Sequence, residues 1–224
     1  MKQEVNLTER MEFVVMMMAS AGIMDAYSYI QRGQVFATGQ TGNFTLMAIR
    51  LVQRDLEGFL HTALAIIAFW IGIFVCWHVF YTLAKEDDKR WKKLVLVIEF
   101  VLLAIVGLLP DTVPDFLVNP VISLSAAFQF CTFRKLGKKD TYASVFCTGN
   151  MRTCAENYYL GLVRKDREAL KKANRFTLIL AAFFAGVVLT AFLCQIVQEK
   201  AIWAVNILFM FMFAYSLLRK RKLQ

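Results

Sequence analysis

The chain contains eight apolar segments, and several approach the roughly 20 residues that a helix needs to cross a bilayer. Hydrophobic residues make up 58% of the sequence, against about 45–50% in a soluble domain. Because this apolar excess is gathered into blocks rather than spread, we expect an integral membrane protein. The segments run approximately over 11–30, 35–52, 59–84, 94–109, 116–133, 141–163, 176–197 and 201–218.

Two of these segments, 35–52 and 141–163, are interrupted by the same polar tripeptide. It is Thr41-Gly42-Asn43 in the first segment and Thr148-Gly149-Asn150 in the second, 107 positions later. A polar tripeptide at corresponding points of two apolar halves is expected of an internally duplicated transporter or channel.

The positions of Lys and Arg indicate how many segments cross, because these residues accumulate in cytoplasmic loops. If 35–52 and 141–163 each enter and leave on one side, six spans remain, with 21 Lys and Arg on the N-terminal side and 4 on the other. Eight spans would give 14 and 11, which is almost no bias. We therefore expect six spans and cytoplasmic termini. This distribution accounts for the net charge of +9 without nucleic acid as a partner.

The expected fold is thus all-α, with six transmembrane helices and two re-entrant or broken segments. The halves, 1–110 and 111–224, each contain three spans and so have opposite orientations in the membrane. Inverted repeats with helices broken at the midplane are a recurrent transporter architecture. The short helices after the breaks are expected over 43–53 and 150–163.

The two tripeptides are candidate substrate-binding residues. A half-helix that begins inside the membrane presents free N–H groups and a partial positive charge, which suit an anionic or strongly dipolar group. Thr or Asn beside Gly also provides N-terminal capping groups. The alternative is that each tripeptide only lets broken helices pack closely. The candidate substrate-binding set is Thr41, Gly42, Asn43, Thr148, Gly149 and Asn150, together with Asp25, Tyr29, Gln129 and Arg152.

Asp25 is a second candidate, because it lies some 14 residues into the first span, where a carboxyl group is costly and normally faces the bundle interior. It could bind a cation, carry a coupling proton or hold substrate. Alternatively, it is a structural partner that caps the re-entrant backbone or pairs with Arg152. Tyr29 lies on the same helical face, at i+4. Gln129 and Thr132 take the positions of Gly22 and Asp25 in the second half, so only the first half has the acid.

Arg152 either pairs with Glu156, four residues later on one helix, or attracts an anionic group of a substrate. Glu99 is expected near the cytoplasmic end of its span. The sequence has no nucleophile triad, phosphate-binding loop, metal motif or redox pair, so we expect no catalytic residue, cofactor or metal and no enzyme activity.

The residues around both tripeptides resemble the signature of the YoaK family, and the resemblance covers nearly the whole chain. Its first motif comprises Gly22, Asp25, Ala26, Ser28, Tyr29, Gly33, Phe36 and Thr41-Gly42-Asn43; its second comprises Phe133, Arg134 and Thr148-Gly149-Asn150. The resemblance implies a six-span protein of the bacterial plasma membrane. The family label is a domain of unknown function, DUF1275, and it implies no activity or substrate.

These patterns predict a transporter of a small solute, proton-coupled through Asp25, with substrate held between the two half-helix N-termini. A passive channel is one alternative, and a non-transporting sensor or assembly protein is another. The expected partners are the lipid bilayer, an unidentified small molecule or ion, and a second copy of the chain in a homodimer.

Overall fold

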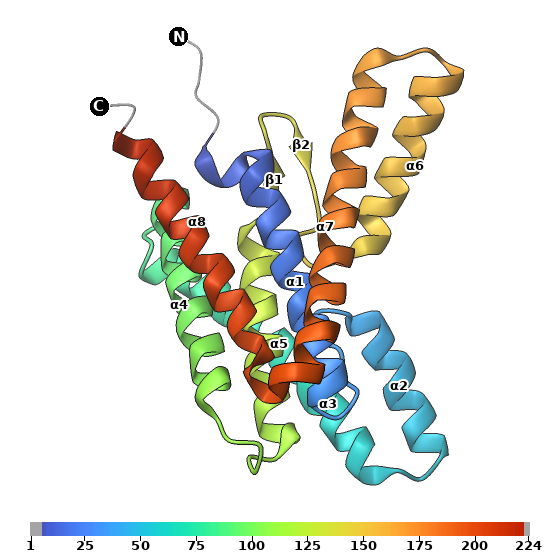
Figure 1. The fold of residues 1–224 in the computed structure, drawn as a ribbon, viewed down its shortest axis with the longest axis vertical. Helices are drawn as coiled ribbons and strands as arrows, with labels where there is room; N and C mark the ends of the chain where they lie inside the picture. The colour runs from blue at the N-terminus through green and yellow to red at the C-terminus, as the bar shows by residue number, and fades with distance from the viewer. Residues whose placement is uncertain (1–5, 222–224) are drawn as a thin grey trace.

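The protein is almost entirely helical (Figure 1), and the computed structural model describes residues 6–221. A short 3-10 helix, η1 (Leu7–Glu9), precedes α1, and a second, η2 (Gln198–Ile202), joins α7 to α8. The α-helices are α1 (Met11–Gln31), α2 (Gln40–Val52), α3 (Leu56–Thr82), α4 (Asp88–Leu108), α5 (Asp115–Thr132), α6 (Cys147–Val163), α7 (Arg167–Val197) and α8 (Trp203–Arg221).

A two-stranded antiparallel hairpin separates α5 from α6. Its strands are β1 (Lys135–Leu136) and β2 (Asp140–Thr141), with Lys135 opposite Thr141 and Leu136 opposite Asp140. The hairpin lies at the same end of the molecule as η1 and the last turns of α8 (Figure 1).

Within the described residues, three helical stretches are long and apolar enough to cross a membrane: Met11–Gln31, Leu56–Thr82 and Arg167–Tyr215. The third includes both α7 and α8, which run in opposite directions on either side of η2 (Figure 1). Large apolar side chains are exposed along these stretches, among them Leu60, Ile67, Trp70, Phe74, Phe184, Val188, Phe192 and Ile196. Apolar exposure on this scale identifies a membrane protein, because soluble monomers rarely expose contiguous apolar patches of more than a few hundred Å².

Helices α2 and α6 are short, and both begin near the middle of the molecule. From there α2 runs beside α3 toward one end, and α6 runs beside α7 toward the other (Figure 1). Both helices begin three residues before their predicted starts of 43 and 150, with Gly39 and Phe146 as their N-cap residues. The tripeptides therefore lie in the first helical turn.

The first helix of each half packs against the other half of the chain: α1 lies along α7, and α5 lies along α3. Glycine allows the α1–α7 approach, because an added Cβ at Gly22 would overlap the carbonyl oxygen of Phe183, and one at Gly186 would overlap that of Ala19. Gly72 of α3 similarly faces Leu124 and Ala127 of α5.

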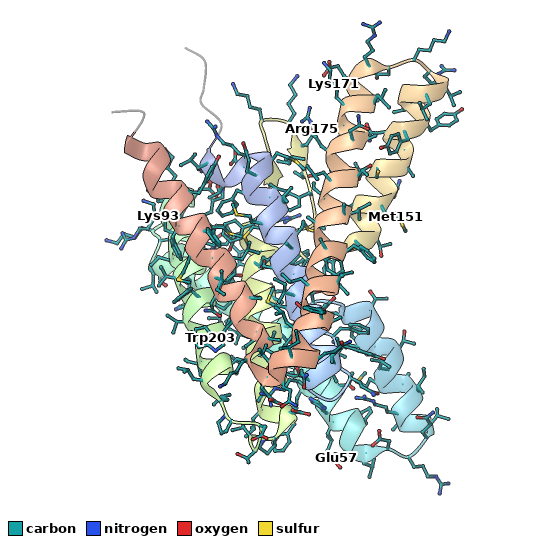
Figure 2. All side chains as sticks on the ribbon, viewed as in Figure 1. Glu57, Lys93, Met151, Lys171, Arg175 and Trp203 are labelled. Carbon is teal, nitrogen blue, oxygen red and sulfur yellow. The ribbon has the colours of Figure 1, made fainter. Side chains whose placement is uncertain are left out.

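Charged groups are concentrated at the two ends of the molecule. Lys93, Lys171 and Arg175 lie toward the end that carries the β-hairpin, whereas Glu57 lies at the opposite end (Figure 2).

The tight turns into α3 and α7 have the same construction. Arg54 and Lys165 have φ of 60° and 59°, and each precedes an Asp that accepts hydrogen bonds from the first turn of the following helix.

Candidate functional site

The loops that lead into α2 and α6 meet at the centre of the molecule. The Thr38 hydroxyl donates a 3.1 Å hydrogen bond to the Val145 carbonyl, and these residues are 107 positions apart, the same offset as the two tripeptides. Both residues are buried. The contact places the N-termini of the two half-helices in one region of the bundle.

Asp25 of α1 binds the backbone that leads into α2. Its Oδ1 accepts hydrogen bonds from the Thr38 N–H at 2.7 Å and the Gly39 N–H at 3.3 Å. A carboxylate at this point satisfies the N–H groups of the two residues just before α2 and interacts favourably with the helix dipole. Asp25 therefore caps the backbone that leads into α2, which is one of the roles considered for it.

Asn43 and Asn150 make the same backbone contacts in the two halves. Asn43 Oδ1 accepts from the Phe36 N–H at 2.9 Å, and its Nδ2 donates to the Phe36 carbonyl at 2.6 Å. Asn150 does the same with Ala143, at 3.0 and 2.8 Å. Both amides are buried. Each therefore ties its helix to the loop seven residues before it, which uses the hydrogen-bonding groups that could otherwise face a substrate.

The other tripeptide positions are more accessible. Thr41 and Thr148 are exposed in the first turns of α2 and α6. A Cβ added at Gly42 would contact the Phe36 ring, whereas one at Gly149 would meet nothing of the described chain within 4 Å. The two helix starts therefore differ: α2 is covered by Asp25 and Phe36, and α6 faces open space at Gly149.

Gln129 is a buried connection between α1, α5 and the second loop. Its Nε2 donates to the carbonyls of Met17 and Ser144, both at 2.8 Å, and its Oε1 accepts from the Ser20 hydroxyl at 3.1 Å. The Ser144 hydroxyl in turn donates to the Gln129 carbonyl at 2.9 Å. All polar atoms of the Gln129 amide are thus occupied by the protein.

Tyr29 and Arg152 differ in their relation to Asp25. The Tyr29 ring stacks on Phe36, with centroids 4.8 Å apart, beside the start of α2. The Arg152 side chain is 80% exposed on α6, and its Nε lies 2.7 Å from Glu156 Oε1. The predicted i, i+4 pair is confirmed, and Arg152 is not the partner of Asp25.

Asp25 also lies close to the loop that leads into α6. Thr38, whose N–H it binds, donates its hydroxyl to the carbonyl of Val145, two residues before α6 begins. A ligand between the half-helices would therefore meet a carboxylate at α2 and the N–H groups and positive dipole end of α6.

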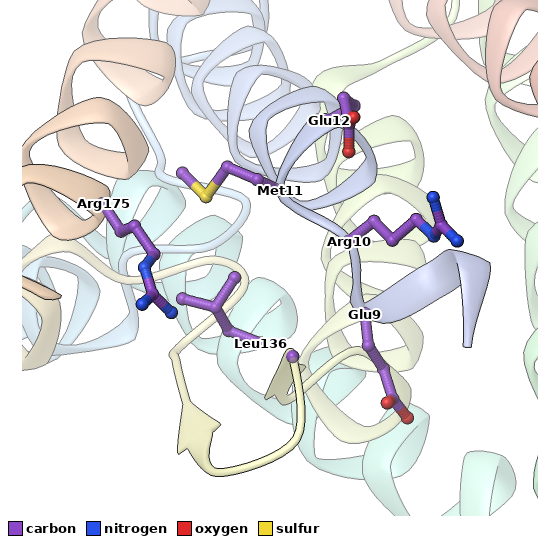
Figure 3. Close-up of a pocket in the computed structure, with 7 residues that line it drawn as sticks. Glu9, Arg10, Met11, Glu12, Leu136 and Arg175 are labelled. Atoms are coloured by element: carbon purple, nitrogen blue, oxygen red, sulfur yellow. The ribbon is translucent and has the colours of Figure 1, made fainter. Parts of the chain in front are cut away.

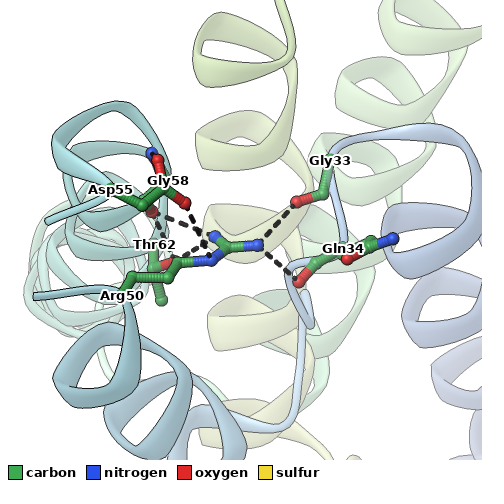
Figure 4. Close-up of polar contacts among 6 residues, drawn as sticks. All are labelled: Gly33, Gln34, Arg50, Asp55, Gly58 and Thr62. Carbon is green, nitrogen blue, oxygen red and sulfur yellow. Dashed lines mark hydrogen bonds and ion pairs between the residues drawn. The ribbon is translucent and has the colours of Figure 1, made fainter. Parts of the chain in front are cut away.

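Arg50 organises the C-terminal end of α2 (Figure 4). Sequence reasoning missed this role, because Arg50 stands out only as a basic residue near a polar turn. Its guanidinium donates to the carbonyls of Gly33, Gln34 and Gly58 and to the Thr62 hydroxyl, at 2.6 to 3.4 Å. Gly33 and Gln34 both have positive φ, which reverses the chain after α1. Arg50 thereby fixes this reversal to the α2–α3 turn.

Three surface hollows lie away from the centre. One, of about 330 Å³, is lined by Glu9, Arg10, Met11, Glu12, Leu136, Gly137 and Arg175 near the start of α1 (Figure 3). A second lies against the C-terminal turns of α2, and a third between the β-hairpin and the α6–α7 turn. The residues that line them are not those of the two helix starts.

Fold and site together define a helical membrane protein in which two short helices, α2 and α6, begin in the middle of the bundle. The carboxyl group of Asp25 lies at the start of α2. The chain belongs to the family described as "Protein of unknown function (DUF1275)", whose family model matches residues 13–215. No curated protein and no solved structure matches it.

Proposed function

We propose that the chain forms two inverted repeats with six membrane spans: α1, α3, α4, α5, α7 and α8. Support comes from the matched backbone contacts of Asn43 and Asn150 and from the matched turns before α3 and α7. The 21-to-4 distribution of Lys and Arg supports cytoplasmic termini; residues 1–5 and 222–224 lie outside the described part. The family resemblance supports the bacterial plasma membrane as the location.

We propose further that the protein transports a small solute carrying an anionic or strongly dipolar group. The observation that carries this proposal is the pair of half-helix starts at the Thr38–Val145 contact, one occupied by Asp25 and the other facing open space at Gly149. The N–H groups of α6 receive the polar group of the solute, and Thr41 and Thr148 add hydroxyls. Asn43, Asn150 and Gln129 hold the loops in place.

Asp25 carries the coupling proton in this mechanism. When ionised, it accepts from the Thr38 and Gly39 N–H groups; protonation weakens these bonds and removes the charge beside α6. Binding of a proton at Asp25 and of an anionic group at α6 therefore favour each other. Such mutual dependence is what couples solute movement to a proton gradient.

The test is uptake by purified protein in proteoliposomes, with and without a pH gradient, over a panel of carboxylates, zwitterionic amino acids and inorganic anions. A transporter accumulates a solute when the gradient is imposed. Flux that only dissipates a solute gradient would indicate a channel, and absence of flux over the panel would favour a sensor or assembly protein.

Asp25→Asn keeps the shape of the side chain and removes its titration. We expect it to abolish gradient-driven uptake and to retain counterflow exchange. Thr41→Ala and Thr148→Ala should instead weaken the apparent affinity for the solute. Glu57→Gln, an exposed change on α3, is the control and should transport normally. Normal uptake against a gradient by Asp25→Asn would refute proton coupling through this residue.

We also propose that a second copy of the chain covers the half-helices. Asn43 is the one buried residue of α2, and α6 buries Asn150 and Cys154, so most of both helices is exposed. The exposed side chains include Phe44 and Met151 beside the polar pair Arg152–Glu156. A monomeric mass in native-like lipid would contradict this arrangement.

A further inference from the structure

The hollow between the β-hairpin and the α6–α7 turn has a volume of about 430 Å³. It lies at the end of the molecule where Lys171 and Arg175 project (Figure 2). Four basic side chains line it, two from the hairpin turn and two from α7, namely Lys138, Lys139, Lys172 and Arg175. Leu136 of the hairpin and Leu160 of α6 add apolar groups to the same lining.

The positive charge of the chain is concentrated on the two segments that form this hollow. Residues 134–140 and 164–175 together contain ten Lys and Arg and three Asp and Glu, a net charge of +7, whereas the whole chain has +9. The α3–α4 turn, residues 85–93, lies on the same side of the membrane in the proposed topology, yet its five Lys and Arg and three acids give only +2. The general preference of basic residues for cytoplasmic loops does not explain why one region receives most of the charge.

Inside the hollow, one carboxylate is shared by two cations. Asp140 Oδ1 lies 2.8 Å from Lys172 Nζ, and its Oδ2 lies 3.4 Å from Arg175 Nη1. Asp140 is half-buried and joins the hairpin to α7 through these contacts. Because two positive charges face one negative charge, a second anionic group would complete the balance.

The other acids of the hollow do not neutralise the lysines of the hairpin turn. Asp166 accepts hydrogen bonds from two N–H groups in the first turn of α7, and Glu168 pairs with Lys171 at 2.8 Å. Across the described part of the chain, no ion pair includes Lys138 or Lys139, and both residues are exposed. The rim of the hollow therefore presents positive charge that the protein itself does not balance.

The hollow is next to apolar surface that faces lipid. The last turns of α6 expose Tyr159, Leu160, Leu162 and Val163, and Leu178 is exposed on α7 one turn after Arg175. Acyl chains can lie along these side chains while a charged headgroup enters the hollow. Basic pockets between membrane helices on the cytoplasmic side are typical binding sites for anionic lipid headgroups.

We propose that this hollow binds the phosphate-bearing headgroup of an anionic phospholipid. Lys138 and Lys139 contact the headgroup at the rim, and Lys172 and Arg175 contact it inside, beside Asp140. A bound headgroup would link the β-hairpin to α7 by a second ionic contact. The site does not depend on the transport function, because none of its residues lies at the starts of α2 and α6.

Native mass spectrometry of the full-length protein in mild detergent, titrated with phosphatidylglycerol, tests the proposal. Phosphatidylcholine with the same acyl chains is the comparison lipid, because its headgroup has no net charge, and we expect it to bind more weakly. Each lysine near an anionic lipid contributes roughly fivefold in affinity, so the exposed double change Lys138→Gln/Lys139→Gln should weaken phosphatidylglycerol binding by about 25-fold. The control Lys89→Gln/Arg90→Gln removes two exposed charges at the start of α4 and should leave binding unchanged.

Asp140→Asn gives a prediction of opposite sign. It releases Lys172 and Arg175 from their carboxylate, so the affinity for phosphatidylglycerol should rise.

Three outcomes would overturn the proposal. Equal affinity for the two lipids would show that charge does not select the ligand. An equal loss in the Lys89→Gln/Arg90→Gln control would assign binding to diffuse surface charge instead of this hollow. Glycerol phosphate that binds as tightly as the lipid would make the ligand a soluble phosphate compound. These measurements involve no solute flux, so their failure is distinguishable from failure of the transport proposal.

Discussion

The paired contacts of Asn43 and Asn150 predict that their truncation destabilises the protein by similar amounts. Alanine at either position removes both hydrogen bonds to the backbone of one loop residue, Phe36 or Ala143. Each unsatisfied buried group costs about 1–3 kcal/mol. Because these loop residues are only half-buried, the lower part of that range applies, and we expect a loss of about 2–4 kcal/mol for each variant.

Reversible unfolding in mixed micelles, followed by circular dichroism as dodecyl sulfate replaces the mild detergent, measures this loss. Asn157→Ala is the matched control on α6, because the Asn157 amide donates one bond, to the Thr153 carbonyl four residues earlier. Its loss should stay below about 1 kcal/mol. Asn150→Asp should be as unstable as Asn150→Ala, since a second oxygen would then face the Ala143 carbonyl.

Stability losses in Asn43→Ala and Asn150→Ala no larger than in Asn157→Ala would contradict the role assigned to the two amides. So would a loss in only one of them, because both side chains make the same two bonds to a loop residue. Loss of solute uptake with unchanged stability would instead assign the amides to binding.

Three further predictions concern packing, pH and topology. Gly22→Ala should prevent the close α1–α7 approach and lower resistance to dodecyl sulfate, whereas Gly149→Ala, which meets open space, should leave it unchanged or raise it by up to about 1 kcal/mol. The pKa of Asp87 is lowered by hydrogen bonds from the Arg90 and Lys89 N–H groups; its stabilising contribution is therefore present above the unfolded pKa and lost as pH falls through the folded value. The stability of the native protein relative to Asp87→Asn should accordingly decrease below about pH 4 and stay constant above it. In a chain without native cysteines, maleimide should label cysteines from outside at 112 and 200 and only after permeabilisation at 138 and 168; external labelling at 138 would contradict the six-span topology.

The helices and the two breaks could be predicted from sequence because they depend on local patterns. Apolar blocks of membrane length give α1 and α3, and the repeated tripeptide marks both short helices. Helices α2 and α6 each begin three residues before their predicted starts, because Thr and Asn do not cap them. The N-cap residues are Gly39 and Phe146, and neither cap has a side-chain hydrogen bond. At α2, Asp25 of another helix binds the Thr38 and Gly39 N–H groups just before the first turn.

The roles of single polar residues were less predictable, because they depend on which helices face one another. Gln129 was a candidate for substrate binding, but its amide is fully used between Met17, Ser20 and Ser144. Glu99 follows a run of basic residues and so resembles a boundary residue, yet its side chain is fully buried in the bundle. Hydropathy along one segment carries no information about such partners.

The fixation of the first loop by Arg50 and Asp25 has a consequence for the evolution of chain length. Arg50 holds Gly33 and Gln34, and Asp25 holds Thr38, so an inserted residue between them would have to break one attachment. The second half crosses the same region through a β-hairpin, yet 18 positions separate Thr132 from Asn150, as they separate Asp25 from Asn43. Homologous chains should therefore vary in side chains here while insertions and deletions are confined to the turns before α3, α5 and α7.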